Sequence, residues 1–208
     1  MQNQLTSVEL PELSYSPSAL EPTLISDILL VHHQKHHRKY VDNYNNLIEK
    51  LVNSAYKKET VQVQKLVPKV KFNAGGHNCH ALYWENLAPA KNGGGELPDD
   101  KSLLTKAVVN EWGSYKHFIK EFTEKTAAIE GSGWGWLAID PNTRTLSIET
   151  TQNQDHVEAG DKVALLTIDA WEHAFYLQYK NDKVDYLQKV WNVVNWRCVE
   201  DRFHKIVL

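Results

Sequence analysis

The sequence predicts an α+β fold, in which an N-terminal helical hairpin is followed by an α/β domain with a three-stranded antiparallel sheet. Three observations carry this prediction: two long helical patterns at the start, a linker rich in Pro and Gly at residues 88–100, and three short strand patterns flanked by helices. Separate runs of helices and strands favour an α+β fold over alternating elements. The linker divides the chain into a helical hairpin domain (residues 1–90) and an α+β domain (residues 91–208).

Apolar periodicity predicts the hairpin. Residues 25–54 contain no Pro or Gly, and their apolar residues recur at helical spacings, so we expect one long helix. A second helical stretch, residues 61–84, is expected to be interrupted at Pro68 and at Gly75-Gly76. Two helices joined by a short connector form an antiparallel pair.

The second half combines helices with three strands. Residues 101–130 are predicted to be helical, with a break at Gly113 and a helix C-cap at Gly131. Alternating or continuous apolar runs then predict three strands, around residues 134–137, 146–148 and 163–168. Residues 185–206 are predicted to return to helix.

Composition excludes several classes of protein. The chain has 23 Lys plus Arg against 26 Asp plus Glu, and this nearly balanced charge argues against a nucleic-acid binder. No apolar run approaches the roughly 18 residues of a membrane-spanning helix. Two distant cysteines, Cys79 and Cys198, suit a reducing compartment and exclude a disulfide scaffold. The first residues resemble no targeting peptide, so a cytoplasmic location is predicted, with the mitochondrial matrix after presequence removal as the alternative.

Histidine is concentrated in the first half of the chain, where six of the ten histidines lie between residues 32 and 80. Helical spacing places residues four or three apart on one face. Four pairs meet this condition: His32 with His36, His33 with His37, His77 with His80, and Asp169 with His173. An aspartate that closes a buried strand is costly without a compensating cation. Nitrogen and oxygen ligands from separate elements suit Mn, Fe or Zn and exclude metals that prefer thiolates.

Other chemical templates are missing from the sequence. It contains no His-Glu-x-x-His protease motif, no phosphate loop ending in Gly-Lys, no Gly-x-Ser-x-Gly nucleophile and no Glu-x-x-His pair of a di-iron bundle. The glycines at 131–135 flank a Trp that would obstruct a phosphate. Isolated histidines are more often surface or core residues, and we expect this of His117, His156 and His204.

Several strings resemble one known family, the iron/manganese superoxide dismutases, over essentially the whole chain. They are HHQKHH at 32–37 with Tyr40, FNAGGHNCH at 72–80 with Tyr83-Trp84, GSGWGW at 131–136, NQD at 153–155, DAWEHA at 169–174, and Tyr176 with QYKN at 178–181. The string DAWEHA is highly specific to that family.

The resemblance implies a site. Four residues would be the metal ligands, with a solvent molecule as the fifth: His32, His80, Asp169 and His173. His36 and Tyr40 would line the substrate gate, and Gln154 would hydrogen-bond the bound solvent. Three histidines would be structural (His33, His37 and His77), and four tryptophans would wall the site (Trp84, Trp134, Trp136 and Trp171).

The resemblance also implies the reaction and the metal. Superoxide would be disproportionated to oxygen and hydrogen peroxide by proton-coupled cycling between Mn(III) and Mn(II). Iron-type members usually carry the glutamine on the second helix, where this chain has Gly76-His77, whereas manganese-type members supply it from the second domain, as Gln154 would. One Mn ion per subunit is therefore expected. An iron-loaded or metal-promiscuous dismutase and a non-catalytic metal buffer built on the histidines are the alternatives.

In the family, the site is completed across a subunit interface. The resemblance implies that Glu172 hydrogen-bonds the partner subunit's His173 and that Tyr176 contacts the partner subunit's His36. These contacts predict at least a homodimer. A homotetramer formed through the hairpin is also plausible. One departure is Lys183-Val184, where the family commonly has Arg and Pro. Lys lacks the planar donor fork of Arg, and Val does not pre-set a helical turn. We therefore expect weaker interface order and lower thermal stability.

Overall fold

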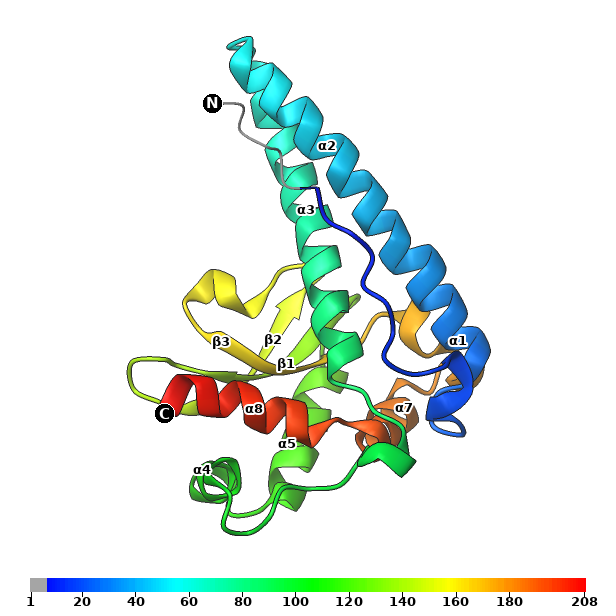
Figure 1. The fold of residues 1–208 in the computed structure, drawn as a ribbon, viewed down its shortest axis with the longest axis vertical. Coiled ribbons are helices and arrows are strands. Elements are labelled where there is room, and N and C mark those ends of the chain that lie inside the picture. Colours follow the sequence, from blue (N-terminus) through cyan, green and yellow to red (C-terminus); the bar gives the residue numbers. More distant parts are fainter. Residues whose placement is uncertain (1–6) are drawn as a thin grey trace.

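A long helical hairpin projects from a compact mixed part in the computed structural model, which describes residues 7–208 (Figure 1). Helix α1 (Ser26–Val31), a π-helical stretch (His32–His37) and α2 (Arg38–Tyr56) follow one another without a break. Three residues then lead into α3 (Thr60–Glu85), which runs back beside α2. The predicted helical hairpin is confirmed.

The interruption that we predicted in the second helix is wrong, because α3 continues through both Pro68 and Gly75-Gly76. Pro68 removes one hydrogen bond to Gln64, but both residues are exposed, so water reaches the freed carbonyl. Both glycines are buried against other parts of the chain. Packing along the whole length of α3 outweighs these local preferences.

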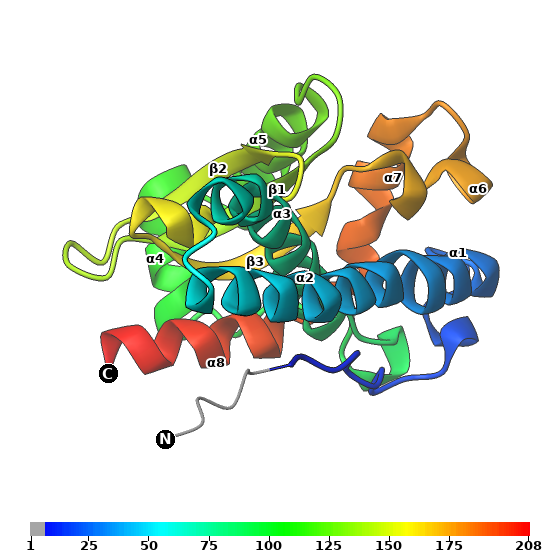
Figure 2. The same ribbon diagram turned by 90° about the horizontal axis from the view of Figure 1, so that it is seen from above.

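The second half contains the predicted three-stranded antiparallel sheet. Strand β1 (Gly133–Ile139) lies between β2 (Leu146–Gln152) and β3 (Val163–Asp169). Trp134 of β1 is opposite Asp169, the last residue of β3. All seven residues of β1 are buried, because helices α4 (Leu103–Trp112) and α5 (Tyr115–Ala127) lie against β1 and β2 on one side, and α3 and α8 (Trp196–Val207) contact β3 (Figure 2).

The helix ends in the second half agree with the sequence prediction at Gly113 and differ from it at two other places. The break at Gly113 is confirmed, since Gly113 has a φ of 77° and Ser114 caps α5. The C-cap predicted at Gly131 is wrong, because α5 ends at Ala127 and Gly131 lies in the turn before β1. The last helical region is likewise divided into α7 (Lys183–Lys189), a 3₁₀ turn (Val190–Val193) and α8, which Asn195 caps through the Cys198 N–H.

One hydrophobic core joins the hairpin to the sheet. Its largest fully buried side chains come from both halves of the chain: Leu24, Ile28 and Tyr83 from the first, and Trp134, Trp136 and Trp196 from the second. The short helix α6 (Tyr176–Tyr179) packs against α1. None of the helices within residues 7–208 combines the length and apolar character that crossing a membrane requires.

The structure of α7 leads to a prediction about Val184. This residue is 47% exposed in the first turn of α7, where backbone N–H groups have no intrahelical acceptor. Val184→Pro should therefore stabilise the fold by reducing the freedom of the unfolded chain, by about 0.4–1 kcal/mol. Calorimetry should show a melting temperature higher by roughly 1–4 °C.

A matched control comes from α4, where Val109 is similarly exposed, at 44%, but lies inside the helix. Val109→Pro should cost about 3 kcal/mol or more, since it breaks a hydrogen bond and clashes with the preceding turn. A lower melting temperature for Val184→Pro would contradict the prediction.

Candidate metal centre

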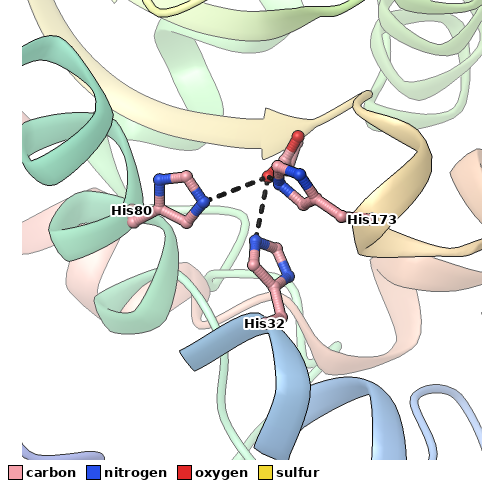
Figure 3. Close-up of side chains that lie close together, drawn as sticks. His32, His80 and His173 are labelled. Carbon is pink, nitrogen blue, oxygen red and sulfur yellow. Dashed lines mark hydrogen bonds and ion pairs between the residues drawn. The ribbon is translucent and has the colours of Figure 1, made fainter. Parts of the chain in front are cut away.

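Four side chains from four separate elements converge at the junction of hairpin and sheet (Figure 3). His32 begins the π-helical stretch, His80 lies on α3, Asp169 ends β3, and His173 lies in the 3₁₀ turn Glu172–Ala174. One nitrogen or oxygen atom from each lies within 4.8 Å of all the others. Within residues 7–208, this is the one group of three or more such side chains that could hold a metal ion.

The Asp169 carboxylate lies at the middle of this group. Its Oδ1 accepts a hydrogen bond from the backbone N–H of Trp171, at 2.8 Å. Its Oδ2 lies 3.0 Å from His173 Nε2, 3.1 Å from His32 Nε2 and 3.8 Å from His80 Nε2. One carboxylate oxygen is thus held by the backbone, while the other faces three imidazoles.

Three imidazole nitrogens have no hydrogen-bond partner in the described part of the chain, and two of them, the Nε2 atoms of His32 and His80, face Asp169. His80 Nδ1 donates to the Gly76 carbonyl at 2.6 Å, which leaves Nε2 of His80 with its lone pair. This Nε2 is fully buried and unpaired, as is Nε2 of His32. Buried polar atoms without partners are rare in proteins. A bound cation would satisfy these nitrogens, so the residues present fit a metal ion.

Burial and mutual repulsion keep the imidazoles of His32 and His80 neutral. Burial lowers the pKa of His32 to about 4, and the neighbouring His173 adds to this effect. Burial likewise lowers the pKa of His80 well below its ordinary value. Burial alone would raise the pKa of Asp169, but the neighbouring imidazoles of His173 and His32 hold it below its usual range. Neutral imidazoles around a carboxylate are the protonation states that metal binding requires.

Within the π-helical stretch, the predicted gate residue His36 has different neighbours from His33 and His37, the predicted structural histidines. His36 is half-buried and its ring stacks on that of His173, with centroids 4.5 Å apart. His33 and His37 point elsewhere. His33 Nε2 donates to the Pro11 carbonyl, at 2.8 Å, and His33 Nδ1 accepts from Gln34.

His37 belongs to a separate hydrogen-bonded chain. Its Nδ1 accepts from Trp84 Nε1 at 3.0 Å, and its Nε2 donates to His77 Nδ1 at 3.0 Å. His33, His37 and His77 therefore have the structural partners that the resemblance implied. His156 is also structural, since its Nδ1 accepts the Glu158 N–H and its ring packs on Trp136.

Gln154 and Tyr40 form a second layer beside the centre. Gln154 Oε1 accepts from Trp134 Nε1 at 3.1 Å, and Gln154 Nε2 donates to the Tyr40 hydroxyl at 3.0 Å. Gln154 is buried. Burial raises the pKa of Tyr40 to about 12, so its hydroxyl keeps its proton at neutral pH.

Three of the four predicted tryptophans lie against ligand rings. Trp84 meets His32 at 4.8 Å between centroids, Trp134 meets His80 at 5.0 Å, and Trp171 stacks on His173 at 5.3 Å. Trp136 differs: its ring lies behind Trp134, at 6.3 Å, and its Nε1 donates to Thr151. Trp136 therefore packs against Trp134 and does not contact the described ligand rings, because it lies two residues further along β1.

The remaining predicted residues lie at the surface. The Glu172 side chain is exposed and makes no hydrogen bond or ion pair within residues 7–208, and Tyr176 is half exposed. Lys35 and Lys39 border a hollow of about 490 Å³ that His36 and Tyr40 also line. Lys183 donates to the Ile129 carbonyl, at 3.1 Å.

Comparison with known proteins agrees with this centre. The α-hairpin domain of the iron/manganese superoxide dismutases matches residues 7–88, and their C-terminal domain matches residues 100–202. The chain belongs to the iron/manganese superoxide dismutase family. The predicted family, fold class and enzyme class, an oxidoreductase acting on superoxide, are confirmed.

Individual relatives cover almost the whole dismutase chain. It is 48% identical over 191 residues to an iron superoxide dismutase of Tetrahymena pyriformis, and the aligned region covers 92% of this chain and 97% of the relative. It is 46% identical over 198 residues to a mitochondrial manganese superoxide dismutase of Capsicum annuum, which covers 94% and 86%. A manganese superoxide dismutase of Chlamydia muridarum is 43% identical over 199 residues, covering 95% and 96%. Similarity alone does not separate the two metals.

The metal-free dismutase should lose stability as the pH falls from neutral towards 4. His32 has a pKa of about 4 in the folded chain against 6.5 for an ordinary histidine, so the unfolded chain binds more protons between these values. The free energy of unfolding should therefore be highest above pH 6.5 and decrease through this window, by on the order of 3 kcal/mol from this residue alone. Urea unfolding of chelator-treated protein measures the change.

Two variants test the origin of this pH dependence. His32→Gln should weaken it, because the buried titrating group is removed. His117→Gln, at an exposed position on α5, should leave it unchanged. A free energy of unfolding that stays constant down to pH 4 would contradict the assignment.

Proposed function

We propose that the chain disproportionates superoxide to oxygen and hydrogen peroxide with one manganese ion per subunit, held by His32, His80, Asp169 and His173. The observation that carries this proposal is the group of three imidazoles and one carboxylate, in which Nε2 of His32 and Nε2 of His80 are buried without a hydrogen-bond partner. Imidazole and carboxylate ligands suit manganese and iron. Bound there, such an ion would supply the redox chemistry, by which one superoxide is oxidised to oxygen and a second is reduced, with two protons, to hydrogen peroxide.

The residues around the ligands keep water out and deliver protons. Trp84, Trp134 and Trp171 cover the ligand rings with apolar surface, which lowers the local dielectric and strengthens electrostatic interactions inside. Tyr40 lies between the hollow and Gln154, so its hydroxyl is placed to pass protons inward from solvent. His36, stacked on His173 at the same hollow, lines the entrance with it.

Gln154 favours manganese over iron in this proposal. Its amide has two N–H donors, and the bond to Tyr40 uses one, which leaves the other for a solvent ligand. Iron-type relatives are expected to carry this glutamine on the second helix, where α3 has Gly76. A Cβ at Gly76 would lie 2.4 Å from Tyr40 Cδ1, so a glutamine there would collide with this tyrosine. Iron loading stays the alternative, since the ligand set suits both metals.

The alternative of a metal-buffering protein has less support. A buffer would bind further ions through the other histidines, but both ring nitrogens of His33 and His37 are already hydrogen-bonded, as is Nδ1 of His77. Within the described residues, one group of ligands is present.

Local positive charge would attract the substrate. The net charge of −3 repels an anion weakly, so the attraction must come from the entrance itself. Lys35, Arg38 and Lys39 line the hollow, with Asp42 as its one acidic residue. This attraction should weaken as salt screens it.

Metal analysis combined with a superoxide-decay assay tests the function. Purified protein should bind one ion per chain, contain more manganese than iron when both are supplied, and accelerate superoxide decay. Asp169→Asn removes the central anion and should abolish both metal retention and activity, whereas Asp201→Asn, exposed on α8, should change neither. Several ions per chain without activity would support the buffer instead.

Gln154→Ala is predicted to shift the midpoint potential of the bound metal and to lower turnover while the metal stays bound. The reason is that a donor to the solvent ligand sets the proton affinity of that ligand, and hence the potential. Pulse radiolysis measures turnover. Gln152→Ala, at an exposed position nearby, is the control, and unchanged turnover for Gln154→Ala would exclude this role.

A homodimer completed through Glu172 and Tyr176 is the proposed assembly. Both side chains are exposed, and the neighbouring helices α1 and α6 carry exposed apolar residues: Leu30 at 46%, Val31 at 38% and Leu177 at 49%. A tetramer through the hairpin and the compartment, cytoplasmic or mitochondrial, stay predictions from the sequence.

Sedimentation equilibrium tests the assembly. The wild-type mass should be that of two chains or, for a tetramer, four. Glu172→Lys should reduce the mass towards the single chain, because a lysine cannot accept the hydrogen bond that the partner's His173 would donate. Glu96→Lys, exposed in the linker, should not alter it. A wild-type protein that is monomeric at micromolar concentration would refute the proposed dimer.

A further inference from the structure

Gly75 and Gly76 lie side by side in the interior of α3, and helix formation does not explain them. Glycine weakens a helix interior relative to alanine, because the unfolded glycine backbone has more freedom to lose. Both glycines have helical backbone conformations within a continuous helix, so no left-handed turn requires them. Both are buried. The reason for them must therefore lie in what packs against α3.

The two glycines contact the two second-layer residues. A Cβ at Gly75 would lie 1.9 Å from the Gln154 backbone oxygen and 3.0 Å from its carbonyl carbon. A Cβ at Gly76 would lie 2.4, 2.5 and 2.9 Å from three carbons of the Tyr40 ring. Neither distance is possible between real atoms, so a side chain at either position would displace its neighbour.

The displaced groups are partners in one hydrogen bond. Gln154 Nε2 donates to the Tyr40 hydroxyl at 3.0 Å, so the positions of the Gln154 backbone and of the Tyr40 ring set this bond together. Gly75 allows the Gln154 backbone to approach α3, and Gly76 allows the Tyr40 ring to pack against α3. Tyr40 reaches α3 from α2 and Gln154 from the loop after β2, and they meet above adjacent residues of the helix.

The loop that carries Gln154 is also held from other sides. Asn153 donates its N–H to the Ser132 carbonyl at 2.8 Å, and its own carbonyl accepts from Trp171 Nε1 at 3.0 Å. Lys71 of α3 pairs with Asp155 at 2.7 Å. A Cβ at Gly75 would therefore push the loop against these bonds and would not simply move it into open space.

We propose that Gly75 and Gly76 are positioning residues, which hold Gln154 and Tyr40 against α3 and so set the hydrogen bond between them. This inference rests on the proposed function, in which Gln154 acts on the solvent ligand of the metal. The glycines touch neither substrate nor metal, and they act through the two residues that they seat.

The first experiment pairs Gly75→Ala with Gln154→Ala in a double-mutant cycle. Gly75→Ala should lower the melting temperature of the metal-free protein, and it should shift the visible absorption and the midpoint potential of the manganese-loaded protein in the same direction as Gln154→Ala. In the Gln154→Ala background it should still lower the melting temperature, because the contacted atom is a backbone oxygen, but it should cause no further shift in potential.

The second experiment uses Gly76→Ala, whose neighbour is a side chain that is able to tilt, so this variant should fold even if Gly75→Ala does not. Gly76→Ala should lower the melting temperature in the wild-type background. In a Tyr40→Ala background, where the ring is absent, the same substitution should cause no loss and should stabilise α3 as alanine normally does. Such rescue would show that the cost arises from the contact with the ring.

Gly160→Ala is the matched control, since its Cβ would meet nothing within 4 Å and its φ is not positive. It should change neither the potential nor the spectrum. If Gly75→Ala raises the melting temperature and leaves the spectrum unchanged, or if its shift persists at full size without Gln154, the positioning proposal is overturned while the dismutase function stands. If Gln154→Ala itself shifts nothing, the role of Gln154 fails and the inference fails with it.

Discussion

The buried carboxylate of Asp169 is the interaction on which the rest of the structure depends. A charged group without solvent is very unfavourable unless other groups compensate it. Here the backbone of Trp171 binds one oxygen, and three imidazoles surround the other. Those imidazoles come from the start of the hairpin, from α3 and from the turn after β3. The hairpin and the sheet must therefore pack together to bring the imidazoles beside this carboxylate, where a cation would compensate its charge.

The same requirement explains the shell of aromatic rings. Tryptophans lie against His32, His80 and His173, and desolvation holds the imidazoles of His32 and His80 neutral at physiological pH. Hydrogen bonds on the outer side fix their orientation, as the Gly76 carbonyl does for His80. The site is thus prepared for a cation by the protein and does not have to rearrange around it. Such preparation lowers the cost of binding.

The mispredicted features have a common physical origin. Local rules read Pro68 and Gly75-Gly76 as helix breakers, yet α3 continues, because contacts with α2, the Gln154 loop and the sheet outweigh the local preference. Trp136 shares a motif with Trp134, but it lies further from the centre, since its place depends on how β1 pairs with its neighbours. In each case a contact between residues distant in sequence decided the outcome.

The sequence by itself determined the elements and the chemistry. Periodicity specified two long helices and three strands, and the spacing of the histidines on the first two helices specified which side chains share a face, because both depend on residues close together in the chain. The tertiary structure alone decided that the four ligand atoms meet within 4.8 Å, that His36 faces the centre while His33 and His37 do not, and that two glycines seat Gln154 and Tyr40. These features follow from how separate elements pack, and packing distances are not encoded in any local pattern.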